Sequence, residues 1–272
     1  MATLCLARGG LAAQEIPFVF KDGLIWIQVT VPQSAQPLNF LLDSGASVSV
    51  VNLATAQSLG MKLGPTVRVR GVNSSSRGHW PQKMKARAGT AELPSKYLAV
   101  DLSSLSDVCS CRVDGLVGAD FFRKQIVQID FEARVIRLLP VEANLPGGLA
   151  LDLKQARGAL LAPVTVNGSG TQWVRVDTGC TSALQWVSDT EAERGLESSV
   201  SIALSETRIP ITQATVRLGD MLFESVPTGL HSRPIFRGED GLLGNGLLRR
   251  FGRITINAKA GKMILEAVKP SS

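Results

Sequence analysis

The sequence predicts a mainly β fold made of two similar halves, and three observations support this. Many short segments rich in Val and Ile are separated by Gly, Pro, Ser and Asn, a pattern typical of strands joined by turns. Two motifs of the first half recur in the same order in the second half. The 272 residues are 44% hydrophobic and 19% charged, which is a globular composition long enough for two compact domains.

The internal repeat has two landmarks in each half. Residues 40–45 read Phe-Leu-Leu-Asp-Ser-Gly, and residues 174–179 read Val-Arg-Val-Asp-Thr-Gly. Residues 114–118 (Asp-Gly-Leu-Val-Gly) correspond to residues 240–244 (Asp-Gly-Leu-Leu-Gly). The first pair of landmarks is 134 residues apart (177 − 43) and the second 126 (240 − 114), a difference that surface loops can absorb. We therefore expect a duplicated unit.

The repeat sets the expected domain boundaries. We expect a leader or disordered segment, a first half, a linker containing Asn, Pro and Gly, and a second half, at residues 1–15, 16–140, 141–149 and 150–268. Small residues near Ala13 resemble part of a signal-peptidase site, but Arg8 interrupts the apolar stretch. Export to a periplasm or to the outside of the cell thus stays one open alternative.

Most of each half is expected to be strand. The predicted strands of the first half are 24–31 and 38–42, followed by a hairpin of 67–72 and 80–88 around a polar tip at 73–78. Those of the second half are 160–166 with 172–176, and 200–204 with 209–218. Short helices are predicted at 49–59, 121–124 and 188–194.

Asp43 and Asp177 each follow an apolar, strand-like segment, so we expect both at buried strand ends. A single Asp-Ser-Gly or Asp-Thr-Gly is an ordinary turn sequence. Two such carboxylates about 3 Å apart, however, cannot both ionise easily and share one proton. One can then act as a general base on water while the other polarises a carbonyl group. The titration belongs to the pair, so neither role is assigned to one residue.

The neighbours of the two aspartates suit this arrangement. The Ser44 and Thr178 hydroxyls can hold the two loops in register. Gly45 and Gly179 permit the close backbone approach that a carboxylate pair requires.

These motifs resemble the aspartic peptidase superfamily, which includes pepsins, retroviral proteases and bacterial retropepsin-like proteins. Residues 40–47 and 174–181 match its hydrophobic-hydrophobic-Asp-Ser/Thr-Gly signature, and residues 116–118 and 242–244 match its downstream hydrophobic-hydrophobic-Gly element. The resemblance covers about residues 16–268. It implies two homologous pepsin/retropepsin-like β-barrel lobes with pseudo-twofold symmetry, a cleft between them, and a catalytic Asp43/Asp177 pair that needs no cofactor.

The resemblance also implies a β-hairpin flap over the substrate. Residues 70–84 would form it, with His79 or Trp80 reaching into the cleft. The alternative is an exposed hairpin whose Trp packs locally. Two departures from the family are the small size of the halves and Cys180, which stands where Ala, Ser or Thr is usual.

Other chemistries lack their residues. The only two histidines, His79 and His231, are far apart and show no metal-ligand spacing, so no metal is expected. The sequence contains neither a Gly-x-Ser-x-Gly elbow nor a Walker loop. For Cys109, Cys111 and Cys180, a disulfide from Cys180 to either of the others and free thiols are both open.

The leading functional hypothesis is an aspartic endopeptidase that acts as a monomer on peptide or protein substrates. One alternative is a non-catalytic peptide-binding or scaffolding protein that retains the fold, and another is pairing of protomers between chains. The net charge of +6 is scattered and comes with no nucleic-acid motif, so nucleic acid is not an expected partner. No apolar run approaches the roughly 20 residues that span a bilayer.

Overall fold

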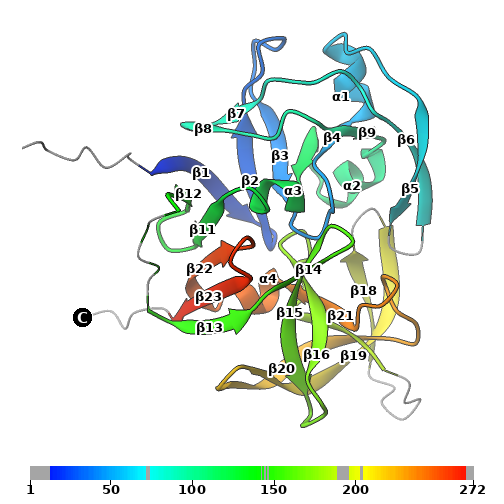
Figure 1. Ribbon diagram of the computed structural model, residues 1–272. Helices are drawn as coiled ribbons and strands as arrows, with labels where there is room; N and C mark the ends of the chain where they lie inside the picture. Colours follow the sequence, from blue (N-terminus) through cyan, green and yellow to red (C-terminus); the bar gives the residue numbers. More distant parts are fainter. Residues whose placement is uncertain are drawn as a thin grey trace, which may run out of the picture.

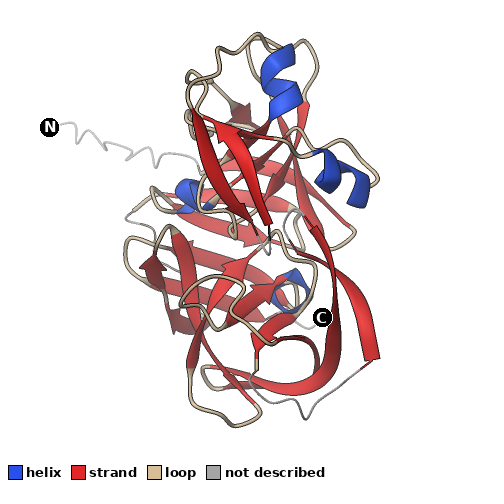
Figure 2. Ribbon diagram, turned by 90° about the vertical axis from the view of Figure 1, so that its right-hand side faces the viewer, coloured by secondary structure: helices blue, strands red, loops and turns tan. Residues whose placement is uncertain are grey.

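The computed structural model describes residues 13–71, 74–141, 143, 145, 147–188, 196–202 and 205–267. The protein is mainly β, as predicted, and the described part holds three sheets and four short helices (Figures 1 and 2). The helices are α1 (Leu53–Ser58), α2 (Ser103–Val108), α3 (Ala119–Phe122) and α4 (Asn245–Leu248).

The largest sheet has thirteen strands in the described residues, in the order β13-β23-β22-β11-β12-β1-β2-β3-β10-β4-β9-β6-β5. In chain order these are β1 (Gln14–Lys21), β2 (Leu24–Val29), β3 (Leu38–Leu42), β4 (Val50–Asn52), β5 (Thr66–Gly71), β6 (Ser74–His79), β9 (Leu98–Val100), β10 (Gly115–Val117), β11 (Ile126–Asp130), β12 (Val135–Leu139), β13 (Leu149–Asp152), β22 (Phe251–Asn257) and β23 (Lys262–Ala267).

The second sheet has eight described strands in the order β14-β15-β16-β21-β17-β20-β19-β18, all from the second half of the chain. They are β14 (Lys154–Ala156), β15 (Ala159–Val166), β16 (Gln172–Asp177), β17 (Leu184–Val187), β18 (Leu196–Ile202), β19 (Ser205–Leu218), β20 (Met221–His231) and β21 (Gly241–Gly244). A two-stranded sheet pairs β7 (Arg87–Ala88) with β8 (Ala91–Glu92).

Strands from both halves meet in the largest sheet. β11 of the first half pairs antiparallel with β22 of the second, with Ile129 opposite Ile254. In Figure 1, β22, β23 and β13 therefore lie beside β11 and β12. The core follows the same pattern, since Phe40, Phe122 and Phe251 are buried in one continuous hydrophobic cluster. The halves thus share a sheet and a core.

The two landmarks of the repeat form the same pairing in each half. β3 runs parallel to β10, with Leu42 opposite Val117. β16 runs parallel to β21, with Val176 opposite Leu243. Both central strands are largely buried on both faces, which explains why they are rich in apolar residues. Each leads directly to an aspartate.

Several predicted elements are confirmed with shifted ends, but one hairpin arm was placed wrongly. The predicted arm at 80–88 is irregular up to residue 86, and the second arm is β6, made of the polar residues assigned to the tip. β6 forms because its backbone pairs with β5 and with β9, and this does not require apolar side chains. The predicted helix at 49–59 shortens to α1, because residues 50–52 form β4. Residues 189–194 of another predicted helix lie outside the described residues.

Candidate active site

Asp43 and Asp177 lie together at the ends of the two central strands. Asp43 directly follows β3, and its N–H donates to the Val117 carbonyl of β10 at 2.9 Å. Asp177 is the last residue of β16. Their exposed fractions are only 9% and 7%, and a hydrogen bond joins the two carboxyl groups. The structure therefore brings one carboxyl group from each half into direct contact.

Glycine makes this contact possible. A Cβ atom built on Gly45 would overlap the Asp177 carboxylate, and one built on Gly179 would overlap the Asp43 carboxylate. Each glycine therefore passes directly beside the aspartate of the other half. Any larger residue would force the two carboxyl groups apart.

Ser44 and Thr178 lock the two loops together by reciprocal hydrogen bonds. The Ser44 N–H donates to Thr178 Oγ1 at 2.9 Å, and the Thr178 N–H donates to Ser44 Oγ at 3.0 Å. Each hydroxyl also donates across to the other half, from Ser44 to the Val176 carbonyl at 2.7 Å and from Thr178 to the Leu42 carbonyl at 2.8 Å. All four bonds are buried, so the loops are held without help from solvent.

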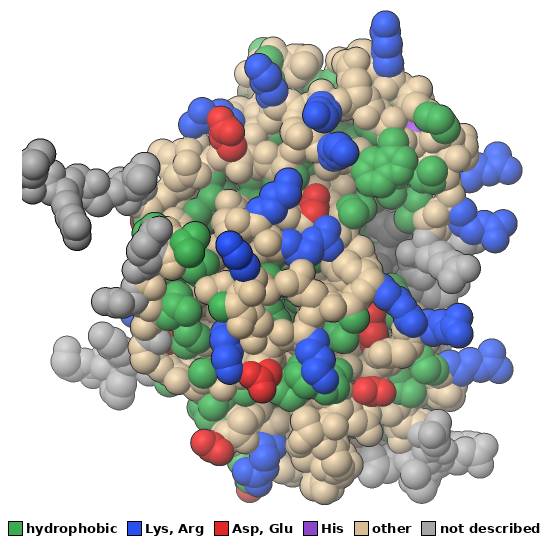
Figure 3. Space-filling view, in the orientation of Figure 1, with side chains coloured by type: hydrophobic (Ala, Val, Ile, Leu, Met, Phe, Trp, Pro, Cys, Tyr) green, Lys and Arg blue, Asp and Glu red, His purple; other side chains and the backbone are tan. Residues whose placement is uncertain are grey.

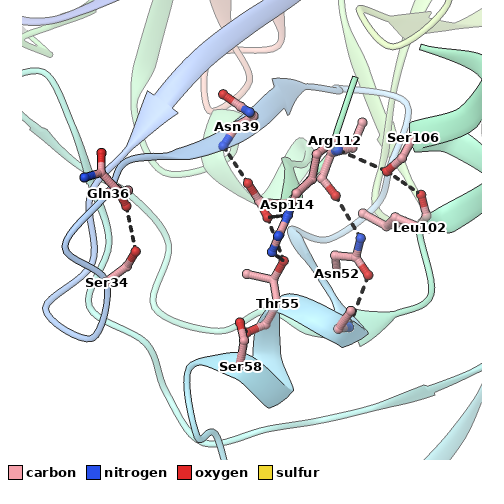
Figure 4. A network of polar contacts seen from close by, with 12 residues as sticks. Ser34, Gln36, Asn39, Asn52, Thr55, Ser58, Leu102, Ser106, Arg112 and Asp114 are labelled. Atoms are coloured by element: carbon pink, nitrogen blue, oxygen red, sulfur yellow. Dashed lines mark hydrogen bonds and ion pairs between the residues drawn. The ribbon is translucent and has the colours of Figure 1, made fainter. Parts of the chain in front are cut away.

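The Asp of each Asp-Gly-Leu motif (residues 114 and 240) accepts a hydrogen bond from the strand that leads to an aspartate of the pair. Asp114 accepts the Asn39 N–H at 3.0 Å and the Thr55 hydroxyl at 2.7 Å, within the network drawn in Figure 4. Asp240 accepts the Trp173 N–H at 3.1 Å in the second half. Asn39 and Trp173 each lie four residues before an aspartate of the pair, which gives the Asp of the Asp-Gly-Leu motif a positioning role.

Burial and mutual repulsion set the protonation of the pair. Desolvation and then the charge of Asp43 raise the pKa of Asp177 well above that of an ordinary aspartate. Desolvation also raises the pKa of Asp43, against hydrogen bonds from the backbone at Ala46 and Gly45 that lower it. The pair therefore retains a proton at pH values where free aspartates are ionised.

A buried ion pair that the sequence reasoning missed supports one side of the site. Arg175, two residues before Asp177, is 4% exposed and donates to both carboxylate oxygens of Glu239 at 2.7 and 2.5 Å. It also donates to the Gly45 carbonyl at 2.5 Å, and its guanidinium lies 3.6 Å from the centre of the Phe236 ring. The sequence feature that could have indicated this ion pair is an Arg between two apolar residues of a buried strand.

A cavity of about 350 Å³ opens beside the aspartates. Its apolar wall comes from the first half and its charged wall from the second, and Asp43 and Asp177 lie among its lining residues. The volume and the apolar wall fit the general form of a pocket for a small molecule or a peptide side chain.

Neither side chain predicted for the flap lies in the lining of this cavity. His79 Nδ1 is 3.1 Å from the Gly64 carbonyl, and the Trp80 side chain is 41% exposed. Val69 of β5 does line the cavity, so the hairpin reaches it through another residue. His231, the second histidine, bonds Gln185 at 2.7 Å, away from this lining.

The three cysteines in the described part of the chain are free thiols. Cys180 is 1% exposed beside the pair, and burial followed by the charge of Asp177 raises the pKa of its thiol. A disulfide from Cys180 to Cys109 or Cys111 is therefore not formed. No group of three or more His, Cys, Asp and Glu side chains in the described ranges could hold a metal ion. Within those ranges no helix is long and apolar enough to cross a membrane.

Residues 27–121 match the family described as aspartyl protease. The matched segment contains Asp43, Ser44 and Gly45 together with the Asp-Gly-Leu landmark at 114–116, and it ends before the second half begins. No curated protein matches the chain.

Proposed function

We propose that the chain is an aspartic endopeptidase with Asp43 and Asp177 as its catalytic pair, and the match of residues 27–121 to the aspartyl protease family supports this proposal. The single observation that carries the proposal is the reciprocal packing of Gly45 and Gly179 against the opposite carboxylates. This packing places two buried carboxyl groups in contact at the edge of a cavity. Such a pair can activate water without a metal ion.

The proposed reaction uses the shared proton. The ionised carboxylate takes a proton from a water molecule as the water oxygen attacks the carbonyl carbon of the scissile peptide bond. The protonated carboxyl group donates a hydrogen bond to the carbonyl oxygen and stabilises the charge that develops there. Transfer of a proton to the amide nitrogen then breaks the C–N bond and releases the two products. Either aspartate can begin as the base, because the proton belongs to the pair.

The proposed architecture is two lobes, 16–140 and 150–268, related by a pseudo-twofold axis that passes between the aspartates. The matching β3–β10 and β16–β21 registers and the reciprocal Ser44–Thr178 bonds support it. Because one chain supplies both carboxyl groups, we propose that the monomer is active. Ser44, Gly45, Thr178 and Gly179 then act by positioning the pair, and the substrate is a peptide or a protein.

The test compares three purified proteins on a diverse peptide library between about pH 3 and pH 7. Asp177→Asn removes one catalytic carboxyl group, whereas Asp220→Asn changes an exposed aspartate on the β19–β20 turn. We expect cleavage by the wild type and by Asp220→Asn, and none by Asp177→Asn with an unchanged circular dichroism spectrum. Equal cleavage by all three would refute the assignment of the pair. Peptide binding without cleavage by any of them would favour a scaffolding protein.

A further inference from the structure

The cavity beside the aspartates has two chemically different walls. Six aliphatic residues of the first half form one wall: Val48, Val50, Val69, Leu98, Val100 and Leu102. The other wall comes from the second half and contains three arginines, one glutamate and Phe236. The repeat therefore does not make the two sides of the site equivalent.

Arg157 and Arg237, two of the three arginines, have guanidinium N–H donors without a hydrogen-bond partner in the described residues. Arg175 is buried, and its hydrogen bonds to Glu239 and Gly45 use its donors internally. Arg157 and Arg237 are exposed at the cavity, and neither has an ion-pair partner among the described residues. The Arg157 guanidinium donates one bond to the Arg237 carbonyl, so most of its five N–H donors remain available.

A tight turn fixes the backbone of Arg157 next to the site. Arg157 and Gly158 join β14 to β15, with φ values of 49° and 85°. The Gly158 carbonyl accepts from Arg123 at 3.1 Å, and a Cβ atom on Gly158 would lie 2.9 Å from Ser47 Cβ. The turn of the second half is therefore packed against the loop that follows Asp43.

The corresponding turn of the first half carries the opposite charge. Asp22 and Gly23 join β1 to β2, also with positive φ values of 53° and 78°. Gly23 packs against Thr181 and its carbonyl accepts from Asn245 at 2.8 Å, so the two turns occupy equivalent places. Asp22 does not line the cavity, whereas Arg157 does. The cationic wall is thus a property of one side of this site.

From this arrangement we infer that the site selects peptides that carry an acidic side chain next to an aliphatic one, with Arg157 and Arg237 binding the carboxylate. This inference rests on the proposed function and specifies its substrate class. The aliphatic side chain would fill the wall formed by the first half, and the carboxylate would meet the free guanidinium donors opposite.

Charge favours an anionic rather than a cationic substrate. When the two aspartates share one proton, they carry one negative charge, and Glu239 carries another. The three arginines carry three positive charges, so the net charge of the lining is +1. Lys and Arg side chains also gather across the middle of the face shown in Figure 3, over the region of the β14–β15 hairpin in Figure 1. A field of this sign attracts acidic peptides from a distance.

The test measures binding separately from cleavage. Asp177→Asn protein, which is expected not to cleave peptides, is titrated onto immobilised short peptides with a central Leu–Leu pair. Each flanking position carries Glu, Gln or Lys in turn. We expect one position at which Glu binds about fivefold more tightly than Gln, the gain that a partly exposed ion pair provides. The gain should shrink between about 0.05 M and about 0.5 M NaCl, because salt screens exposed charges.

Three further substitutions, made in the Asp177→Asn background, assign the effect to the arginines. Arg237→Glu should reverse the preference so that Lys is favoured at that position. Arg157→Asn, which tolerates the positive φ of the turn, should abolish most of the Glu preference. Arg217→Glu changes an exposed arginine of β19 outside the cavity and should leave the preference intact.

The outcomes separate this inference from the proposed function. Equal binding of Glu, Gln and Lys peptides at every position would overturn the inference, whether or not the wild type cleaves peptides. A Glu preference that Arg217→Glu removes as fully as Arg237→Glu would also overturn it. A Glu preference that depends on Arg157 and Arg237 would support it, even if no peptide were cleaved and the peptidase proposal failed.

Discussion

Replacing Thr178 by Val tests the lock between the two halves, because the side chain keeps its shape and loses only its hydroxyl. That hydroxyl accepts the Ser44 N–H at 2.9 Å and donates to the Leu42 carbonyl at 2.8 Å, both in the buried interior. Without it, one N–H and one carbonyl remain unpaired. Each such group costs about 1–3 kcal/mol, so the free energy of unfolding should fall by about 2–6 kcal/mol.

The assay is urea denaturation of the wild type, Thr178→Val and Thr178→Ser, with the denaturant slope compared as well as the midpoint. Thr178→Ser keeps the hydroxyl and should lose only the contribution of a buried methyl group, about 1 kcal/mol. Peptidase activity should fall by about 100-fold in Thr178→Val, because small displacements of catalytic groups have effects of that size. A loss of stability no larger in Thr178→Val than in Thr178→Ser would refute the reasoning.

Three other predictions follow from the site. Gly45→Ala should abolish peptide cleavage because its Cβ atom overlaps the Asp177 carboxylate, whereas Gly170→Ala, with open space around the new Cβ atom, should retain full activity. Glu239→Gln should lower the free energy of unfolding by about 3–5 kcal/mol in urea denaturation, since Arg175 then stays buried without the carboxylate that it pairs with, and replacing both residues by Leu should recover most of the loss. The pKa of Asp177 is raised in the folded state by burial and by Asp43, so the folded pair holds a proton that the unfolded chain releases. The stability it contributes is present below the unfolded pKa of about 4 and is lost as pH rises through the folded pKa. The wild type should therefore lose more stability than Asp177→Asn between about pH 4 and pH 7, and parallel curves would contradict this.

The parts of the fold that were predictable share one property, which is that they repeat. Asp43 and Asp177 each follow a largely apolar, strand-like segment, and each segment has an Asp-Gly-Leu partner downstream. Those two patterns predicted a mainly β protein with aspartates at buried strand ends. They also indicated where the backbone passes closely, because Gly45 and Gly179 permit the approach that a carboxylate pair requires.

Other features depended on partners that no local pattern reveals. β6 consists of Ser, Arg, Gly and His, a composition typical of a turn, and it is a strand because β5 and β9 pair with it. Arg175 is paired with Glu239, 64 residues away, across a loop whose path the sequence did not indicate. The flap prediction placed the hairpin near the cavity but selected His79 and Trp80, because side-chain direction depends on strand register.

The β11–β22 pairing also determines when the molecule can become functional during its synthesis. Until residues 251–257 have left the ribosome, the edge of β11 that faces the second half has no partner, and its N–H and carbonyl groups remain open to other strands. The nascent first half carries Asp43 but has no opposite carboxyl group and no Thr178 to lock its loop. Because contacts over such long sequence separations form late in folding, any activity of the pair should first appear only after residues 251–257 have been made. If the proposed function holds, the unfinished chain would therefore be inactive beside its own ribosome.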